Sequence, residues 1–251
     1  MRAIIKCVPN FFTLLNLLAG SIAIVFSFEK KIEFGCYLIF LAVIFDFLDG
    51  FLARILNARS ELGKQLDSLA DLISFGLAPS VFIYHLFKLH YIKTNWSGLL
   101  NPGLVDVLFL GAGFTIVIFS ALRLAKFNTD PEQKMNFKGL PTPANAIFVS
   151  SLPLIVFTYD NTIYVDIVLN VYFLVAVSII MPVLLIINMR MFSLKMIGFA
   201  FKKNIFQFIL IIASVILLIF LHFLAVPVIV LLYILLSFIK NITNKNNTIK
   251  S

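Results

Sequence analysis

Charged residues and cysteine are both scarce in this sequence. Asp, Glu, Lys and Arg together make up 13% of the 251 residues, against about 25% in a typical soluble domain. Hydrophobic residues reach 61%, more than a water-soluble chain of this size can cover with polar groups. The two cysteines, Cys7 and Cys36, are too few for a disulfide framework or a thiolate metal site. These shortages exclude a soluble globular domain and predict an integral membrane protein.

Long apolar runs divide the chain into about eight membrane-spanning helices, so the expected fold class is all-α. A bilayer core about 30 Å thick needs roughly 20 apolar residues per helix. The runs that meet this requirement cover 10–28, 34–55, 63–87, 105–127, 143–159, 167–188, 204–222 and 224–239. The last two are separated by almost no loop, around His222 to Pro227, which predicts a tight helical hairpin.

The same division predicts three parts of unequal character. A core of six spans is expected over residues 1–190, and a C-terminal transmembrane hairpin over 191–240. The remaining segment, 241–251, is rich in Asn and Lys, a composition typical of a disordered tail.

Basic residues are distributed unevenly between the two ends of the predicted helices. Lys and Arg concentrate on the cytoplasmic side of membrane proteins. Of the 20 basic residues, 16 fall on the side that holds both termini. The other 4 are Lys30, Lys31, Lys88 and Lys93. We therefore expect a multi-pass protein of the cytoplasmic membrane with both termini inside, whose net charge of +8 reflects contact with anionic lipids rather than nucleic acid.

Aspartates inside the second and third predicted spans are the first functional candidates. They are Asp46, Asp49, Asp67 and Asp71. A carboxylate at membrane depth costs several kcal/mol unless it is paired or binds a cation. The first two are three residues apart and the last two are four apart, so each pair shares one helix face. Because a short connection makes the two helices antiparallel neighbours, the four carboxylates can converge near the cytoplasmic boundary.

Converging carboxylates predict a divalent-cation site. Oxygen ligands favour Mg²⁺, Mn²⁺ or Ca²⁺ over Zn²⁺, and an open cluster of this kind suits two metal ions that clamp a phosphate or pyrophosphate. Gly50, Ala53 and Gly63 each lie one helical turn from an aspartate and leave room for a ligand. The alternative is a purely structural network of salt bridges, whose basic partners would be Arg54, Arg59 and Lys64.

The aspartates also belong to a longer pattern. Residues 46–71 read DFLDGFLARILNARSELGKQLDSLAD and match D-x2-D-G-x2-A-R-x8-G-x3-D-x3-D at every fixed position. The segment resembles the signature of the CDP-alcohol phosphatidyltransferases. Further stretches resemble the bacterial and archaeal members of this family that use serine as the acceptor: PNFFTLLNLLAG (9–20), SFGLAPS (74–80), RLAKFN (123–128) and FKGLPTPANA (137–146).

The resemblance implies an integral membrane enzyme that moves the phosphatidyl group of CDP-diacylglycerol to L-serine and releases CMP with the help of Mg²⁺ or Mn²⁺. It implies that Asp46, Asp49 and Asp67 hold the metals. Asp71 would either share a metal or act as the base for the serine hydroxyl. The residues expected to border the CDP-lipid are Gly50, Ala53, Arg54, Ser60 and Gly63. The other implied partners are membrane lipids and a second copy of the chain in a homodimer.

Two basic residues near the end of the fourth span are candidates for holding the acceptor or a phosphate. They are Arg123 and Lys126. Lys126 stands where Arg is usual in the family, which keeps the charge but loses a bidentate grip. For Arg123 the alternative role is anchoring at the cytoplasmic membrane surface. Gly76 and Pro79, in the stretch SFGLAPS, are equally compatible with a structural kink inside a helix.

Two other functions stay open at this stage. The acceptor could be glycerol-3-phosphate or inositol phosphate, whose own phosphate would call for the charges of Arg123 and Lys126. A divalent cation transporter would also contain acids in apolar helices. Its acids would be expected near the middle of the membrane and in repeated halves. Here the acids cluster towards one face and no repeat is visible.

Overall fold

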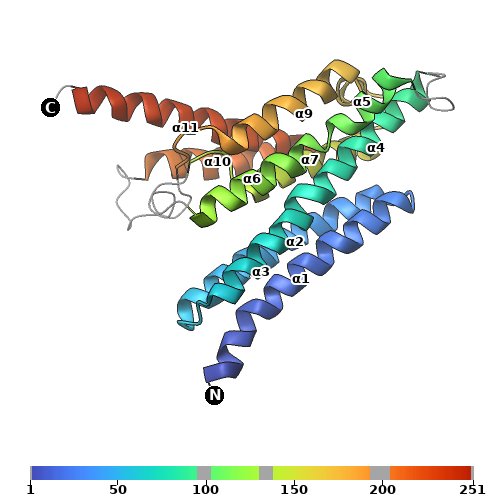
Figure 1. Cartoon of the computed structure of the whole chain (residues 1–251). Helices are drawn as coiled ribbons and strands as arrows, with labels where there is room; N and C mark the ends of the chain where they lie inside the picture. Colours follow the sequence, from blue (N-terminus) through green and yellow to red (C-terminus); the bar gives the residue numbers. More distant parts are fainter. Residues whose placement is uncertain (1, 95–102, 130–137, 193–203, 250–251) are drawn as a thin grey trace.

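The computed structural model describes residues 2–94, 103–129, 138–192 and 204–249, and these residues are almost entirely helical (Figure 1). Within these ranges the β-structure consists of one isolated β-bridge, between Lys138 and Arg190. The all-α fold class is therefore confirmed. Several of the basic residues that predict the orientation, such as Lys134 and Lys195, lie outside the described residues.

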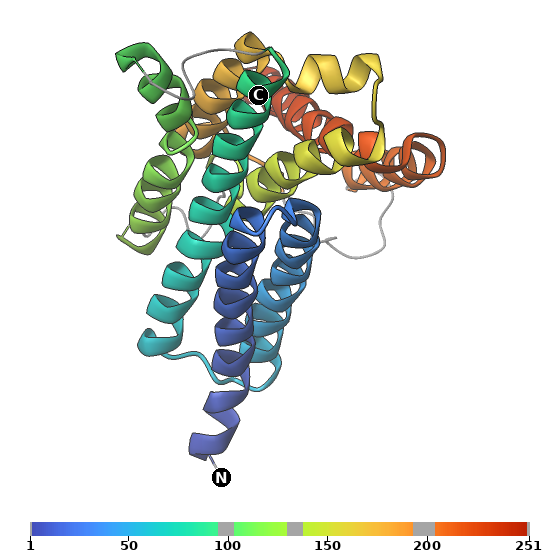
Figure 2. The ribbon, with the colours of Figure 1, turned by 90° about the vertical axis from the view of Figure 1, so that its right-hand side faces the viewer.

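The helices follow one another without a sheet between them. Their bounds are α1 Arg2–Phe28, α2 Ile32–Ile55, α3 Glu61–Asp71, a π-helix η1 Leu72–Leu77, α4 Ala78–Lys93, α5 Leu104–Ala112, α6 Thr115–Thr129, α7 Thr142–Thr158, α8 Ile163–Val168, α9 Val171–Ile186, α10 Ile205–Leu221, a 3-10 turn η5 His222–Leu224 and α11 Ala225–Ile249. In Figure 2, α1, α2 and α3 run side by side in the lower half, and the later helices gather in the upper half.

Several of these helices are long and apolar enough to cross a membrane. They are Cys7–Phe28, Ile32–Ile55, Glu61–Lys93 and Ile205–Thr243, to which α5 and α6 add a fifth if the pair, bent by 42°, counts as one span. The chain is therefore a multi-pass membrane protein. The expected number of eight spans is not confirmed, because α7 is only 17 residues long and rises about 25 Å, short of the roughly 30 Å bilayer core.

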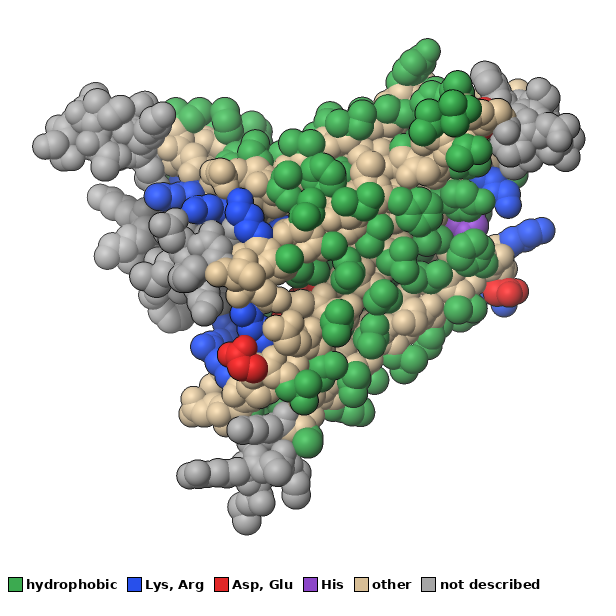
Figure 3. All heavy atoms as spheres, in the orientation of Figure 1, with side chains coloured by type: hydrophobic (Ala, Val, Ile, Leu, Met, Phe, Trp, Pro, Cys, Tyr) green, Lys and Arg blue, Asp and Glu red, His purple; other side chains and the backbone are tan. Residues whose placement is uncertain are grey.

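The surface has the distribution of side chains that a bilayer requires. Hydrophobic side chains cover the outer faces of the helices in Figure 3. Phe47 of α2, for example, is 60% exposed. Lys and Arg side chains gather mainly at one end of the molecule, with a smaller group at the other end (Figure 3). An apolar belt between two polar ends places lipid tails against the sides of the bundle.

The third long helix changes its winding immediately after Asp71. Six residues, Leu72–Leu77, form a π-helix before the chain returns to α-helix at Ala78. Pro79 contributes to this change because it has no N–H to continue an α-helical ladder. The packing there is also tight, since a Cβ on Gly20 of α1 would lie 2.6 Å from the Ser74 Cα. The kink that the sequence allows at Gly76 and Pro79 is thus a π-helix within one continuous helix of 33 residues.

Helix α7 is the most enclosed part of the fold, packed against α2, α4 and α11. The turn that leads into it is fastened to the end of α9, because the Leu140 N–H donates to the Leu184 carbonyl and the Gly139 N–H to the Met189 carbonyl. Gly139 has a φ of 78°, and a Cβ there would run into the Leu185 carbonyl. Only glycine combines that backbone conformation with so close an approach.

The C-terminal helices α10 and α11 form the hairpin that the sequence predicts. They pack against each other, and the Lys240 Nζ lies 5.6 Å from the ring centroid of Phe206, 34 positions earlier in the chain. His222, with a φ of 48°, makes the turn between them. The structure differs from expectation in the tail, where α11 continues to Ile249 instead of ending near Lys240. Extending an existing helix gains one backbone hydrogen bond per residue without a new nucleation cost.

Candidate active site

Three of the four predicted aspartates meet in space. One carboxylate oxygen from each of Asp46, Asp49 and Asp67 lies within 4.8 Å of the others. Asp46 and Asp49 come from one face of α2, and Asp67 comes from α3. Both α2 and α3 pack against α1, which brings the two helices next to each other. The helical spacing and the short connection therefore produce the convergence that the sequence predicts. We call these three residues the carboxylate cluster.

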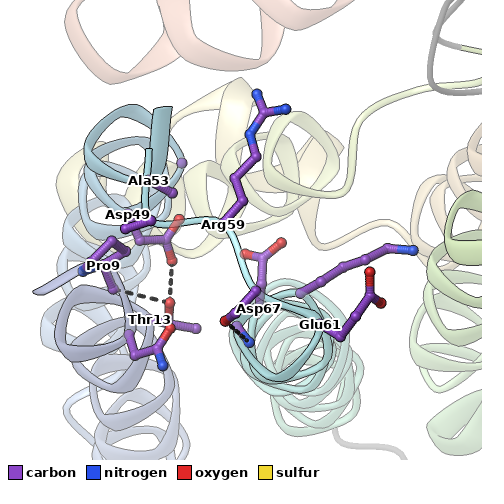
Figure 4. A pocket seen from close by; sticks show the side chains of 13 residues that line it. Pro9, Thr13, Asp49, Ala53, Arg59, Glu61 and Asp67 are labelled. Carbon is purple, nitrogen blue, oxygen red and sulfur yellow. Dashed lines mark hydrogen bonds between the residues drawn. The ribbon is translucent and has the colours of Figure 1, made fainter. Parts of the chain in front are cut away.

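Two members of the carboxylate cluster, Asp49 and Asp67, line a pocket of about 610 Å³ at the end of the molecule where α2 ends and α3 begins, and Asp46 is not part of its lining. Asp49 and Asp67 face each other across it, while the Arg59 side chain extends away from them (Figure 4). Its full lining is Pro9, Asn10, Thr13, Asp49, Gly50, Ala53, Ala58, Arg59, Ser60, Glu61, Gly63, Lys64 and Asp67. The lining thus comes from α1, α2, α3 and the turn between α2 and α3.

The contribution of α1 is the part of the site that sequence reasoning missed. The Thr13 hydroxyl donates a hydrogen bond of 2.7 Å to Asp49 Oδ2 (Figure 4), and Asn10 also lines the pocket. With Asn16, these polar residues recur at intervals of three in an otherwise apolar helix. That spacing places all three on one helix face. It is the signal that could have revealed them.

Asp71 stands apart from the carboxylate cluster. It lies one turn beyond Asp67 on α3, is only 7% exposed, and is not among the three residues whose oxygens meet. The Asn16 amide donates a hydrogen bond of 3.1 Å to Asp71 Oδ1, and the Ser74 hydroxyl donates one of 2.6 Å to the Asn16 carbonyl oxygen. Asp71 is therefore held by neutral polar groups in the position next to the cluster.

The carboxylate cluster fits a divalent cation. Asp67 Oδ1 is buried without a hydrogen-bond partner among the described residues. In the part of the chain that the structure describes, the one ion pair is Lys93 with Asp166, at the far end of the helices. The salt-bridge network considered from the sequence is therefore wrong, since none of its basic residues pairs with the acids. Closely spaced carboxylates without a basic partner need a cation to offset their repulsion, and oxygen donors suit Mg²⁺, Mn²⁺ or Ca²⁺.

The residues predicted to border the CDP-lipid divide into two groups. Gly50, Ala53, Ser60 and Gly63 line the pocket as expected. Ser60 has a second task as the N-cap of α3, because its hydroxyl accepts a hydrogen bond of 3.0 Å from the Gly63 N–H. Arg54 is not part of the lining. Its Nε donates back to the Gly50 carbonyl at 2.7 Å, which keeps the exposed side chain along α2.

Arg123 and Lys126 end up in different environments. Arg123 is only 9% exposed, and its Nη1 donates to the Thr142 hydroxyl at 3.3 Å. Lys126 is exposed, and its Nζ donates to the Asn188 side chain at 3.4 Å. Lys126 thus has the exposure that an anchor at the membrane surface needs. Burial excludes that role for Arg123.

Comparison of the sequence with known proteins identifies a family for this chain. The family model described as CDP-alcohol phosphatidyltransferase matches residues 6–176. The chain belongs to this family. The matched range begins within α1 and ends within α9, and it contains the carboxylate cluster, its pocket and Asp71. The hairpin of α10 and α11 lies outside the match.

The family members most similar in sequence include enzymes named for serine. The chain is 35% identical over 143 residues to a CDP-diacylglycerol–serine O-phosphatidyltransferase of Helicobacter pylori, covering 56% of this chain and 54% of that protein. It is 33% identical over 176 residues to an archaetidylserine synthase of Methanothermobacter thermautotrophicus, covering 69% and 66%. It is 34% identical over 155 residues to the Bacillus subtilis CDP-diacylglycerol–serine enzyme, covering 61% and 77%. The chain thus spans about half the length of the Helicobacter relative.

Proposed function

We propose that this chain transfers the phosphatidyl group of CDP-diacylglycerol to L-serine, giving phosphatidylserine and CMP. The observation that carries the proposal is the placement of Asp71 beside the carboxylate cluster, outside the set of oxygens that meet. A site of this kind separates cation binding from proton removal. The names of the relatives from Helicobacter pylori and Bacillus subtilis support serine as the acceptor.

The pocket accounts for binding of the donor lipid. Gly50 and Ala53 leave space on the α2 side for the cytidine diphosphate, and Arg59 and Lys64 supply positive charge at its edge. The pocket opens at the polar end of the bundle, while apolar helix faces border the lipid. A CDP-lipid can therefore keep its acyl chains in the bilayer while its headgroup reaches the acids.

The carboxylate cluster would hold Mg²⁺ or Mn²⁺, and we propose that two such ions bind there. Bound there, such ions supply charge neutralisation for the pyrophosphate and for the departing CMP. Thr13 orients Asp49 for this role through its hydrogen bond. Asp67 keeps an unpartnered oxygen in the buried part of the site.

Asp71 would act as the general base. It takes the proton of the serine hydroxyl, and the serine oxygen forms a bond to the phosphorus of the phosphatidyl group while the bond from that phosphorus to the CMP oxygen breaks. The Asn16 amide holds the Asp71 carboxylate in place without adding a charge that would lower its basicity. The products are phosphatidylserine and CMP, and the proton leaves from Asp71.

The proposal includes the location of the site. We infer that the chain lies in the cytoplasmic membrane with both termini and the pocket on the cytoplasmic side, where soluble serine and CMP are exchanged. The excess of Lys and Arg on that side of the sequence supports this orientation. A homodimer, which the family resemblance implies, is part of the same proposal and can be tested by cross-linking in native membranes.

The deciding experiment is an acceptor panel. Purified protein in detergent, supplied with CDP-diacylglycerol and Mg²⁺ or Mn²⁺, is expected to release CMP with L-serine and to form phosphatidylserine. Glycerol-3-phosphate and inositol phosphate are expected to give little product. CMP release with either phosphate-bearing alcohol but not with serine would replace the proposed acceptor. No release with any alcohol would contradict the transferase activity itself.

A further inference from the structure

Arg123 is a buried cation without an anionic partner. Its Nη1 donates to the Thr142 hydroxyl, while its Nε has no hydrogen-bond partner among the described residues. No carboxylate of the described chain lies within ion-pair distance of it. The charge of Asp71 acts on Arg123 from beyond ion-pair distance. An arginine in this state is stabilised by an anion that brings its own charge into the site.

Asn145 is a second unsatisfied group on the same side of α7. It lies three residues after Thr142, so the two side chains share one face of the helix. Its side chain is fully buried, and neither its Oδ1 nor its Nδ2 has a hydrogen-bond partner in the described part of the chain. A buried amide that leaves both its donor and its acceptor unused is costly unless a ligand satisfies them.

We propose that Asn145, together with Arg123 and Thr142, forms the subsite that binds the α-amino and α-carboxylate groups of the acceptor. The Arg123 guanidinium would bind the carboxylate. The Asn145 Oδ1 would accept from the ammonium group, and its Nδ2 would donate to the carboxylate. This inference rests on the proposed function, because it assigns the acceptor of that reaction to particular atoms.

The donor and acceptor pattern distinguishes between classes of alcohol. A zwitterionic amino acid carries both donors and acceptors, and so matches both atoms of the Asn145 amide. The phosphate of a phosphate-bearing alcohol offers only acceptor oxygens to this subsite. The Asn145 Oδ1, also an acceptor, would then face them without a hydrogen to share. The start of α7 adds a helix N-terminus, which favours a carboxylate but repels the ammonium group. An acceptor atom beside the ammonium is therefore needed, and Asn145 provides it.

The position relative to Asp71 completes the assignment. Asp71 interacts electrostatically with Arg123 and also with all three acids of the carboxylate cluster. An amino acid held by Arg123 and Asn145 would thus have its side-chain hydroxyl directed towards Asp71. Tyr233 of α11 also interacts electrostatically with Arg123, its hydroxyl donates to the Phe192 carbonyl at 3.0 Å, and α11 packs against α7.

The test compares Asn145 with a matched residue of the same helix. Asn145→Ala is measured beside Ser150→Ala, since Ser150 is also fully buried with an unpartnered oxygen but lies five residues further along α7, on another face. KM is measured separately for serine and for CDP-diacylglycerol. Inhibition constants are measured for 3-hydroxypropionate, which is serine without its ammonium group, and for ethanolamine, which is serine without its carboxylate.

Asn145→Ala is expected to raise the KM of serine by roughly ten- to hundred-fold, the range for lost hydrogen bonds to charged groups. The KM of CDP-diacylglycerol is expected to stay the same, and the preference for serine over 3-hydroxypropionate is expected to shrink by a similar factor. Ser150→Ala is expected to change neither constant. Arg123→Lys is expected to weaken inhibition by 3-hydroxypropionate more than inhibition by ethanolamine, because only 3-hydroxypropionate has the carboxylate that Arg123 binds.

Asn145→Asp keeps the size of the side chain and guards against a folding defect. It is expected to fold and to bind serine more weakly than the wild type, because its own carboxylate pairs with Arg123. An unchanged serine KM in both Asn145 variants, or an equal rise in the KM of both substrates, would overturn the subsite. Failure of the proposed function is seen separately, as a wild-type protein that releases CMP with another alcohol and not with serine.

Discussion

Asn16 of α1 donates a hydrogen bond of 3.1 Å to Asp71 at the end of α3, and it accepts one of 2.6 Å from Ser74 in the following π-helix. The Ser74 hydroxyl also lies 2.6 Å from the Ala70 carbonyl of its own helix. The Asn16 amide therefore joins Asp71 to the start of the π-helix. A residue of the first helix thus sets the position of the proposed base on the third. The close approach of Gly20 to Ser74 makes that contact between helices possible.

Removal of the Asn16 donor is expected to impair turnover more than binding. Asn16→Leu keeps a similar volume but leaves Asp71 without its hydrogen-bond donor, and kcat is expected to fall by roughly ten-fold or more, since a lost hydrogen bond to a charged group is worth about 1.5–3 kcal/mol. Ser21→Ala is the control, because this exposed hydroxyl of α1 bonds only to its own helix, at the Leu17 carbonyl. Equal kcat values in the two variants would leave Asn16 without a role in catalysis.

Replacements of Asp71 and Asp49 are expected to fail in different ways. Asp71→Asn preserves shape but removes the base, and is expected to reduce kcat by roughly 10²-fold or more at every metal concentration. Asp49→Asn removes a ligand of the carboxylate cluster, and is expected to raise the metal concentration needed for half-maximal activity. Metal titrations of both variants make the comparison. A loss that extra metal restores in Asp71→Asn would show that Asp71 is a metal ligand.

Activity is expected to depend on divalent cations. The carboxylate cluster holds three acids with no basic partner among the described residues. Treatment with EDTA should therefore abolish CMP release, and Mg²⁺ or Mn²⁺ should restore it. Full turnover in the presence of the chelator would contradict a cation site at the cluster.

The contact between α1 and the π-helix predicts a stability defect. A Cβ on Gly20 would lie 2.6 Å from the Ser74 Cα, which is backbone and cannot move aside alone. Gly20→Ala is expected to destabilise the protein by about 1–3 kcal/mol, as overpacking does. Gly111→Ala is the matched change, because nothing lies within 4 Å of its added Cβ. Thermal unfolding in detergent measures both, and a Gly20 variant as stable as the Gly111 variant would refute the close packing.

The orientation can be tested with one exposed cysteine at a time, in a background where Cys7 is replaced by Ser and the fully buried Cys36 is kept. Leu56→Cys lies in the turn between α2 and α3, and Glu29→Cys lies in the turn between α1 and α2 at the opposite end of the helices. An impermeant thiol reagent added to intact cells is expected to label the cysteine at position 29 and not the one at 56. The reverse pattern would place the pocket outside the cell.

Local periodicity was enough to predict much of the site. The spacing of Asp46 and Asp49 determines that they share a helix face, because the geometry of an α-helix depends only on its own backbone. The short turn before α3 makes Asp67 a neighbour of the first pair for the same local reason. Composition likewise determined the membrane class, since no arrangement of this chain could cover so much apolar surface with so few charges.

Only the tertiary structure decided which groups each acid meets. The π-helix after Asp71, the approach of Asn16 from α1 and the contact of Arg123 with Thr142 on α7 all depend on how helices far apart in the sequence pack. Such packing follows from the fit of whole surfaces, such as Gly20 against Ser74, and a linear pattern does not contain it. The separation of Asp71 from the carboxylate cluster, and the unpartnered amide of Asn145, are consequences of that fit.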